Sequence, residues 1–481
     1  MKNAKSSGLN LTATEIARVT KGVLTGVTDC TIHSISTDTR SIKEGDIFLA
    51  LEGENFNGHE YVAQAIKKGA LGAIVKKGFK MTVNDKQMNL FLEVDDTLDA
   101  YQDIAAHNRD RHNAKVVAIT GSTGKTTTKE MVRSILSTLA DSAVISEKNF
   151  NNHVGVPMTL LKIRENHKVA VLEIGINQIN EMDRLAQITN PDIALVTNAG
   201  SSHLEFLKNV DTVAHEKMKL ADGLKEGGTL IYNYDDLRLL SHARSKKART
   251  MTFGFSKKAD ISGVLFEDIR LNQSKLLVRL SADEEVAMNL KINGKHNAYN
   301  ALAAITIARA LKIQTDDIFK GLESFEPKDM RSENIALNRE MVLTNDAYNA
   351  NPDSMKAALT LHAGFKGGGR KVVVLGDMHE LGSYSERAHK EIGADLTNFN
   401  IDLMFFYGEE MKHAAKNAGL LGVDKKRIHW HSDLDTLFDD LVSRLEYGDW
   451  ILIKGSRPNR LEVIAEKLID TIGVTDKLIS R

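Results

Sequence analysis

The sequence predicts an α/β protein of about three domains, each built on a mainly parallel sheet. The chain has 481 residues, and a domain holds roughly 150 residues on average. Three separate stretches alternate short β-rich runs with helical patterns, which is typical of sheets covered by helices. The composition, 42% hydrophobic and 26% charged without a long biased tract, indicates folded domains with sizeable cores.

The first stretch carries the weakest motifs. Strand patterns at 46–51 and 71–75 flank a helical pattern at 61–68. Because strand and helix patterns alternate here, we expect a small α/β unit. We place its end at residue 113, so that the first predicted domain spans residues 1–113.

The second stretch opens with an apolar run at 115–120, of the kind that forms a buried strand. Near its end, residues 260–293 alternate polar and apolar positions, as an antiparallel meander does, and an alanine-rich helical pattern follows at 300–311. We place the second boundary after Glu326, which gives a central domain of residues 114–326.

The third stretch, residues 327–481, contains three clear strand patterns, at 371–375, 403–407 and 450–453. Each ends at glycine or a charged residue, which predicts a Rossmann-like sheet. The motif G-x-G-x-x-G does not follow the first of these strands, so the pattern gives no support to dinucleotide binding.

The charge balance excludes a global attraction to anionic partners. Lys and Arg number 63 and Asp and Glu 64, a net charge of −1, so no basic field draws the chain to nucleic acid or to an anionic membrane. The single cysteine, Cys30, fits a reducing compartment. The sequence shows neither a secretory signal nor a run of ~20 apolar residues, so we expect a cytoplasmic protein without membrane insertion.

The strongest motif is a glycine-containing turn between the strand pattern 115–120 and a helix that begins near Lys125. It is the short P-loop variant T-G-[ST]-x-G-K-T, since the strict form would need glycine at Ile119. Backbone N–H groups at such a helix N-terminus can surround phosphates, and we expect Lys125 to neutralise phosphate charge and the Thr126 hydroxyl to bind Mg²⁺. The predicted phosphate-binding residues are Gly121, Ser122, Thr123, Gly124, Lys125, Thr126 and Thr127.

Two further strand ends supply candidate ligands. Glu173 follows the apolar run 169–172, and Thr197 and Asn198 follow the run 193–196. Ligands of open parallel sheets gather beyond the carboxyl ends of the strands, so these residues are expected to face the same crevice as the glycine turn. Glu173 suits a Mg²⁺ ligand, although a structural carboxylate is an equal alternative at this point. His203 lies a few residues beyond the Thr-Asn pair, where an imidazole reaches a metal.

These residues together resemble the ATP-dependent Mur ligases of peptidoglycan synthesis. The resemblance is carried by the P-loop, the run 149–157 (NFNNHVGVP), the segment from Thr197 to Leu204, and Glu216 with Lys217. Five more segments are similar to the branch of the family that adds D-alanyl-D-alanine to UDP-N-acetylmuramoyl-tripeptide. They are residues 36–40 with 45–48, 294–297, 346–355, 375–382 and 454–457.

The resemblance implies an architecture of three domains: an N-terminal domain for the UDP-muramoyl substrate, a central P-loop ATPase and a Rossmann-like C-terminal domain. It also implies a reaction in which ATP activates the tripeptide carboxylate as an acyl phosphate, which the dipeptide amine then attacks. The cofactors would be ATP and Mg²⁺, and the partners UDP-N-acetylmuramoyl-tripeptide and D-alanyl-D-alanine. We expect a monomer.

The same resemblance assigns site residues. The UDP-muramoyl substrate would contact Ser36, Asp38, Arg40, Asn151 and Asn152. The nucleotide would contact Asn297, Arg331, Asp346 and Tyr348. One Mg²⁺ would be held by Thr126 and Glu173, and another by His203 and Lys217, the last carbamylated by carbon dioxide into an anionic oxygen ligand. The catalytic set would be Lys125, Glu173, His203 and Lys217.

Two departures from the family pattern bear on this assignment. Asn57 stands where the branch often has aspartate, and Lys219 where it often has an acidic residue. A cation beside Lys217 lowers its pKa, so we expect Lys219 to favour the neutral amine that carbamylation requires.

Other activities remain open from the sequence. They are another Mur ligase such as the one that adds the third amino acid, a folylpolyglutamate synthetase, an ATPase that joins nothing, and a nucleotide-binding protein without catalysis. The segments from Tyr348 to Met355 and from Lys454 to Arg457 argue against the first two. The set of presumed metal ligands argues against the last.

Overall fold

A computed structural model describes residues 8–53, 56–80, 89–137, 142–268, 273–327, 330–365 and 368–475. The chain forms two compact units. The first comprises residues 1–118, 139–175 and 183–192, and the second residues 119–138, 176–182 and 193–481. Strand β10 contributes to both.

A five-stranded sheet lies near the N-terminus, in the order β2-β9-β8-β5-β4. Strands β4, β5, β8 and β9 run parallel, and β2 pairs antiparallel with β9. Phe48, Val75 and Phe91 are buried together on one face of this sheet, where Val62 and Ala65 of α2 pack against them. The strands of this sheet are β2 (Val23–Gly26), β4 (Ile35–Ser36), β5 (Ile47–Leu49), β8 (Gly72–Lys76) and β9 (Leu90–Val94), and the nearby helices are α1 (Ala13–Thr20), α2 (Val62–Lys67) and α4 (Thr97–Asp110). Two short antiparallel pairs lie outside the sheet: β1 (Leu11–Thr12) pairs with β3 (Thr31–Ile32), and β6 (Glu52–Gly53) pairs with β7 (Phe56–Asn57).

A nine-stranded sheet follows, in the order β11-β12-β10-β13-β14-β15-β16-β17-β18. The pairs from β13 to β16 are parallel, whereas β16, β17 and β18 form the predicted antiparallel meander. Its strands are β10 (Lys115–Thr120), β11 (Ala143–Ile145), β12 (Val169–Glu173), β13 (Ile193–Val196), β14 (Thr229–Asn233), β15 (Arg249–Gly254), β16 (Ile261–Asp268), β17 (Gln273–Arg279) and β18 (Glu285–Leu290).

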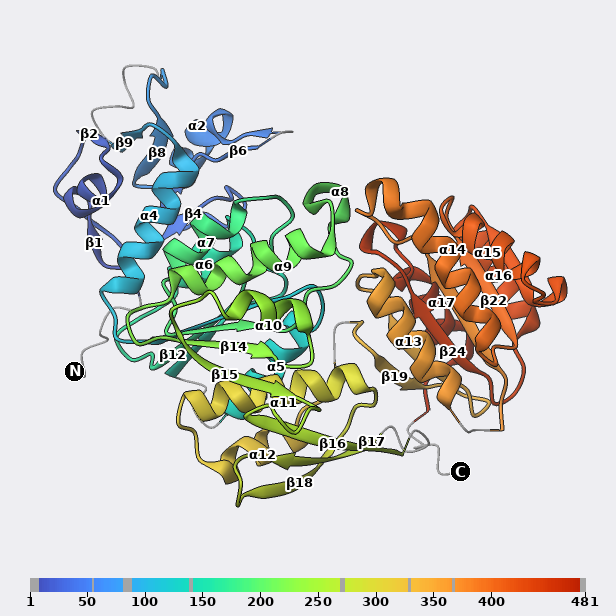
Figure 1. Cartoon of the computed structure of the whole chain (residues 1–481). Helices are drawn as coiled ribbons and strands as arrows, with labels where there is room; N and C mark the ends of the chain where they lie inside the picture. Colours follow the sequence, from blue (N-terminus) through green and yellow to red (C-terminus); the bar gives the residue numbers. More distant parts are fainter. Residues whose placement is uncertain are drawn as a thin grey trace. The chain divides into compact units, whose positions relative to one another are not determined.

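The helix α11 (Lys295–Ala310) is largely buried next to this sheet. It is rich in alanine, and this allows it to pack closely against α5 (Lys125–Ile135), β15 and β16 (Figure 1). Other helices of this part are α6 (Gly155–Leu160), α7 (Glu181–Thr189), α8 (Leu204–Leu207), α9 (Val210–Met218), α10 (Leu237–Ala243) and α12 (Thr315–Glu323).

A six-stranded sheet forms the last part, in the order β19-β20-β24-β21-β22-β23, with only β19 antiparallel. It agrees with the predicted Rossmann-like pattern. The strands are β19 (Glu333–Ala336), β20 (Val342–Asp346), β21 (Lys371–Gly376), β22 (Leu403–Tyr407), β23 (Ile428–His431) and β24 (Trp450–Lys454).

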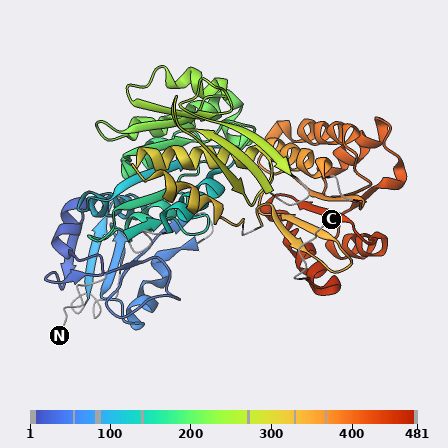
Figure 2. The same cartoon turned by 90° about the horizontal axis from the view of Figure 1, so that it is seen from below.

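Helices cover both faces of this sheet (Figure 2). Val373 and Leu375 point into a core with α13, α14 and α15, while Val372 and Val374 point into a second core with α16 and α17, because side chains alternate along a strand. Asn351 and Ser354 form a capping box that starts α13 with proline in its first turn. These helices are α13 (Pro352–Gly364), α14 (Ser385–Asp395), α15 (Met411–Leu420), α16 (Leu434–Arg444) and α17 (Glu462–Ile472).

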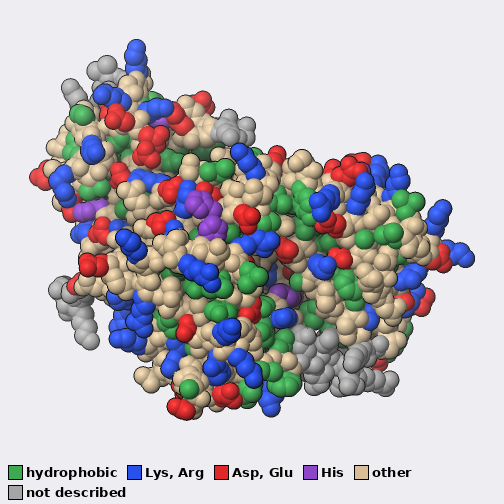
Figure 3. Space-filling view, viewed as in Figure 1, with side chains coloured by type: hydrophobic (Ala, Val, Ile, Leu, Met, Phe, Trp, Pro, Cys, Tyr) green, Lys and Arg blue, Asp and Glu red, His purple; other side chains and the backbone are tan. Residues whose placement is uncertain are grey.

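Acidic and basic side chains are interspersed on the face shown in Figure 3, in keeping with a net charge of −1. Across the described ranges, none of the helices combines the length and apolar character that a membrane span requires.

Candidate active site

The phosphate-binding turn has the predicted context: β10 ends at Thr120 and α5 begins at Lys125. Both glycines of the turn are required. Gly121 has φ +149°, and a Cβ there would lie 1.8 Å from the Thr197 Oγ1. Gly124 has φ +82°, and a Cβ there would lie 2.2 Å from the Asn300 Oδ1. Glycine therefore lets the turn adopt its backbone shape and lie close to two neighbouring elements.

The Lys125 ammonium folds back over the turn and donates a hydrogen bond to the Gly121 carbonyl oxygen at 2.7 Å. Thr126, in the first turn of α5, is only 9% exposed. The first turn of α5 carries no acidic side chain. Lys125 and the helix N-terminus thus form a positive end that favours an anion.

The loop after β13 lies against the turn, as the sequence predicted for Thr197 and Asn198. The Thr197 Oγ1 donates to the Thr123 carbonyl oxygen at 2.6 Å, and the Asn198 Nδ2 donates to the Thr123 Oγ1 at 2.9 Å. The Ser122 Oγ accepts a hydrogen bond from the Gly200 N–H at 2.9 Å. These contacts fix the turn before any ligand binds.

Asp236 was missed by the sequence reasoning. Its Oδ2 accepts a hydrogen bond from the Ala199 N–H at 2.8 Å, and its Oδ1 caps α10 through the Arg238 N–H. It therefore supports the loop that holds the turn. The detectable signal was two adjacent aspartates, Asp235 and Asp236, just beyond the end of β14.

Glu173 ends β12 and is 2% exposed. Its Oε1 accepts a hydrogen bond from the Asn151 Nδ2 at 2.9 Å, and its backbone N–H donates to the Ser146 Oγ. Asn151 therefore orients the carboxylate. The Oδ1 of the neighbouring Asn152 accepts hydrogen bonds from the N–H groups of Val154 and Gly155, just before and at the start of α6.

His203 takes a left-handed backbone conformation, with φ +53°, at the start of α8. Its Nδ1 lies 2.5 Å from the Glu380 Oε2, and this contact lowers the pKa of Glu380. The sequence placed Glu380 in the family-like segment 375–382 but assigned it no role, since nothing near it in the sequence points to His203.

Lys217, on α9, is 1% exposed. Burial, together with the positive charge of Lys125, holds the pKa of Lys217 well below the usual range of a lysine. Both effects act against the ammonium and towards the neutral amine, which is the form that reacts with carbon dioxide.

The expectation for Lys219 was wrong. The Lys219 Nζ lies 2.9 Å from the Glu216 Oε1, so a carboxylate compensates its charge, and Lys125 is the cation that lowers the pKa of Lys217. The expectation took account of the charge of Lys219 but not of Glu216, three residues earlier in the chain.

Of the four predicted nucleotide residues, Asn297 lies on α11 and Arg331 just before β19, while Asp346 ends β20 and Tyr348 follows it. The Arg331 guanidinium stacks on the Tyr348 ring, 4.0 Å from its centre. The Asp346 Oδ2 accepts a hydrogen bond from the Lys454 Nζ at 2.6 Å, and its Oδ1 accepts one from the Ser332 N–H. Asn297 is 3% exposed and donates through its Nδ2 to the Asn293 carbonyl oxygen.

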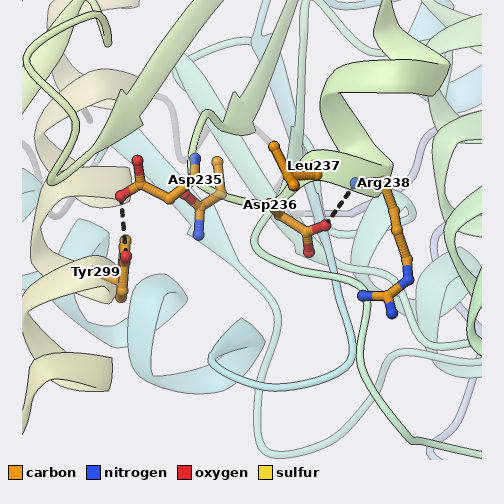
Figure 4. A pocket seen from close by; sticks show the side chains of 6 residues that line it. Asp235, Asp236, Leu237, Arg238 and Tyr299 are labelled. Carbon is orange, nitrogen blue, oxygen red and sulfur yellow. Dashed lines mark hydrogen bonds between the residues drawn. The ribbon is translucent and has the colours of Figure 1, made fainter.

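A pocket of about 590 Å³ opens beside the end of β14 (Figure 4). Sequence reasoning did not identify it. The Tyr299 hydroxyl donates to the Asp235 Oδ2 at 2.9 Å, and this contact together with burial raises the pKa of Tyr299. The pocket is lined by Asn233, Asp235, Asp236, Leu237, Arg238 and Tyr299.

The predicted substrate residues near the N-terminus form a compact polar loop. Arg40 pairs with Asp38 through two parallel contacts, Nε to Oδ1 at 3.0 Å and Nη2 to Oδ2 at 2.7 Å. This pairing lowers the pKa of Asp38 to about 2. The Ser36 Oγ accepts a hydrogen bond from the Asp38 N–H, so the three residues act as one unit.

Within the described ranges, no three His, Cys, Asp or Glu side chains gather in a way that could hold a metal ion. The four predicted metal ligands would not form such a group in any case, because Thr126 and Lys217 are not His, Cys, Asp or Glu.

Three family models match successive parts of the chain. They are the Mur ligase family catalytic domain at residues 31–109, the Mur ligase middle domain at 119–308, and the Mur ligase glutamate ligase domain at 330–457. The UDP-N-acetylmuramoyl-tripeptide--D-alanyl-D-alanine ligase of Bacillus subtilis (strain 168) is 36% identical over 462 residues, 96% of this chain and 98% of that protein. The enzyme of the same name from Escherichia coli (strain K12) is 32% identical, over 96% and 98%.

Solved structures agree with these relatives. A crystal structure of MurF from Acinetobacter baumannii superposes with a TM-score of 0.87 at 30% identity, covering 96% of this chain and 99% of that one. MurF ligase from Thermotoga maritima in complex with ADP gives a TM-score of 0.80 at 25% identity, covering 91% and 97%.

Proposed function

Because the chain belongs to the Mur ligase family, we propose that it joins D-alanyl-D-alanine to UDP-N-acetylmuramoyl-tripeptide and converts ATP to ADP and phosphate. The observation that carries the proposal is the phosphate-binding turn between β10 and α5, in a chain similar over almost its whole length to ligases of that name.

The chain has the three-domain Mur ligase architecture. We propose boundaries at 1–113, 114–326 and 327–481. The three family matches, each of which falls inside one of these ranges, support this division.

ATP is proposed to bind with its phosphates at the turn from Gly121 to Thr127. Backbone N–H groups there would donate to phosphate oxygens, and Lys125 would leave the Gly121 carbonyl to neutralise the γ-phosphate. Arg331, Asp346, Tyr348 and Asn297 are proposed to contact the rest of the nucleotide. The stacking of Arg331 on Tyr348 supports this role, since the planar guanidinium binds phosphate oxygens in a defined geometry.

The chemistry follows from the weakness of a carboxylate as an electrophile. The terminal carboxylate of the tripeptide would attack the γ-phosphorus of ATP, forming an acyl phosphate and releasing ADP. The uncharged amine of D-alanyl-D-alanine would then attack the acyl carbon, lose a proton, and expel phosphate as the peptide bond forms. Lys125 would stabilise the charge on the transferring group.

Mg²⁺, when bound, would polarise phosphate oxygens and balance their charge. We propose Thr126 and Glu173 as ligands of one ion and His203 and Lys217 as ligands of another. Mg²⁺ prefers oxygen ligands to an amine, so we propose that Lys217 is first carbamylated. Its burial and lowered pKa support this modification, because only the neutral amine attacks carbon dioxide. The orientation of Glu173 by Asn151 supports its role as an oxygen ligand.

We propose that Ser36, Asp38 and Arg40 contact the UDP-muramoyl substrate with Asn151 and Asn152, and that the enzyme works in the cytoplasm. The bonded loop of Ser36, Asp38 and Arg40 supports the first point, as its 88% exposed guanidinium is available to an anion. The monomeric state remains a prediction.

Phosphate release tests the proposal against its alternatives. Release from ATP should require both UDP-N-acetylmuramoyl-tripeptide and D-alanyl-D-alanine. Release without either acceptor would indicate an ATPase that joins nothing, and release supported by a single amino acid or by glutamate in place of the dipeptide would indicate another ligase of the family. No release at all would indicate a binding protein.

A further inference from the structure

Glu216, Lys219 and Asn180 form a closed ring of contacts around the C-terminal end of α9, which we call the α9 clamp. The Lys219 Nζ lies 2.9 Å from the Glu216 Oε1 and donates to the Asn180 Oδ1 at 2.9 Å. The ring closes where the Asn180 N–H donates to the Glu216 Oε2 at 2.8 Å. Each of the three residues thus contacts the other two.

The charged side chains of the clamp are shielded from solvent and paired with polar partners. The side chains of Glu216 and Lys219 are only 3% and 14% exposed. A carboxylate this buried needs compensating partners, and it has a cation and an N–H. Asn180 has φ +71°, which asparagine tolerates better than most residues, so its N–H and its Oδ1 can both face α9.

The clamp joins residues on both sides of Lys217 along the chain. Glu216 precedes Lys217 and Lys219 lies two residues after it, so fixing both side chains fixes the backbone between them. Asn180 belongs to the segment that leaves β12 shortly after Glu173 along the chain. The clamp therefore connects α9, which carries the proposed metal ligand Lys217, to the segment that follows Glu173, a second proposed metal ligand.

We propose that the α9 clamp positions Lys217 for carbamylation, so that Glu216, Lys219 and Asn180 act as positioning residues for this lysine. The inference deepens the proposed function and depends on it for the modification itself. Lys219 acts through geometry rather than through its charge, because Glu216 compensates that charge. Loss of the clamp should leave the turn free to move, so that the carbamate forms less readily at a given bicarbonate concentration.

The experiment uses [¹³C]bicarbonate and NMR detection of the carbamate carbon on the full chain. Asn180→Gly removes the side-chain contact while tolerating φ +71°, and Lys219→Met removes the ammonium. We expect half-maximal carbamylation of both variants to need roughly tenfold more bicarbonate, the lower end of what partners that orient metal ligands contribute. Turnover should recover at saturating bicarbonate, with the KM for ATP unchanged.

Two further variants separate positioning from simple stabilisation. Lys246→Met removes another ion pair of the same unit, between the Lys246 Nζ and Asp222 at 2.7 Å, and should leave the bicarbonate dependence unchanged. The double variant Glu216→Lys with Lys219→Glu restores opposite charges but presents the wrong partners to Asn180. It should therefore keep the weakened bicarbonate dependence.

Wild-type bicarbonate dependence in Asn180→Gly and Lys219→Met would overturn the positioning role, even if their melting temperatures fell. Full recovery in the charge-swapped variant would overturn it as well, since an ion pair alone would then suffice. A wild-type protein without any carbamate signal would instead refute the carbamylation on which the inference depends.

Discussion

The positive charge of Lys125 lowers the pKa of Lys217, although one residue starts α5 and the other lies on α9. Both are lysines, and repulsion between like charges adds to the cost of burying the Lys217 ammonium. Burial and the charge of Lys125 therefore both lower the pKa of Lys217, with burial the larger cause.

Removal of the Lys125 charge should make carbamylation of Lys217 harder. In Lys125→Met the pKa of Lys217 should rise, so less of the amine is neutral at a given pH and the carbamate should appear only at higher pH. The carbamate carbon signal measured against pH tests this. A profile identical to that of the wild type would show that burial alone sets the pKa.

Gly124→Ala should weaken ATP binding. A non-glycine residue at φ +82° costs about 1–3 kcal/mol, and the added Cβ would also meet the Asn300 Oδ1. Gly227 is the matched control because it has φ +73° and open space around its Cβ position. We expect both variants to lose stability but only Gly124→Ala to lose affinity for ATP, measured by calorimetry. If Gly124→Ala and Gly227→Ala bound ATP equally well, the close contact between Gly124 and Asn300 would not matter for ATP binding.

Glu173→Gln should abolish most turnover while preserving the fold. The amide oxygen can still accept the hydrogen bond from Asn151, but the charge that balances Mg²⁺ is lost. A metal ion contributes several kcal/mol, so kcat should fall roughly a hundredfold or more. The exposed Glu165→Gln serves as the control. Full activity of Glu173→Gln would refute the metal assignment.

The stability of the last domain should fall on acidification because of His362. Burial lowers the pKa of His362 from 6.5 to about 3. Above pH 6.5 both the folded and the unfolded chain hold it neutral. Below that pH the unfolded chain binds a proton that the folded chain does not, so the free energy of unfolding falls by up to about 1.4 kcal/mol per pH unit until the pH approaches 3.

Urea unfolding at several pH values measures this effect. The fluorescence of Trp430 and Trp450 reports on this domain, because both of the protein's tryptophans lie in it. His362→Met should show a shallower pH dependence than the wild type. Parallel pH profiles for the two proteins would contradict the prediction.

Local patterns predicted the fold and the phosphate-binding turn because both depend on neighbours in the sequence. The apolar run 115–120, Gly121 and Gly124 together specify a buried strand, a tight turn and a helix start. The alternation at 260–293 likewise predicted the antiparallel β16, β17 and β18.

Contacts between distant residues could not be predicted in this way. Nothing near Glu380 indicates that it meets His203, and nothing near Lys219 indicates that Asn180 accepts its hydrogen bond. The wrong expectation for Lys219 has a different origin: its charge was considered without Glu216, three residues earlier in the chain, which the structure pairs with it.

The most direct test of the central claim is the mass of the product. Purified protein, ATP and Mg²⁺ are mixed with UDP-N-acetylmuramoyl-tripeptide and an equimolar mixture of D-alanyl-D-alanine, L-alanyl-L-alanine and free D-alanine, with one of the three isotopically labelled in each reaction. The account predicts one product, heavier than the tripeptide by one dehydrated dipeptide and labelled only when D-alanyl-D-alanine carries the label. A product that contains a single amino acid, or ATP consumption without any new peptide bond, would contradict it.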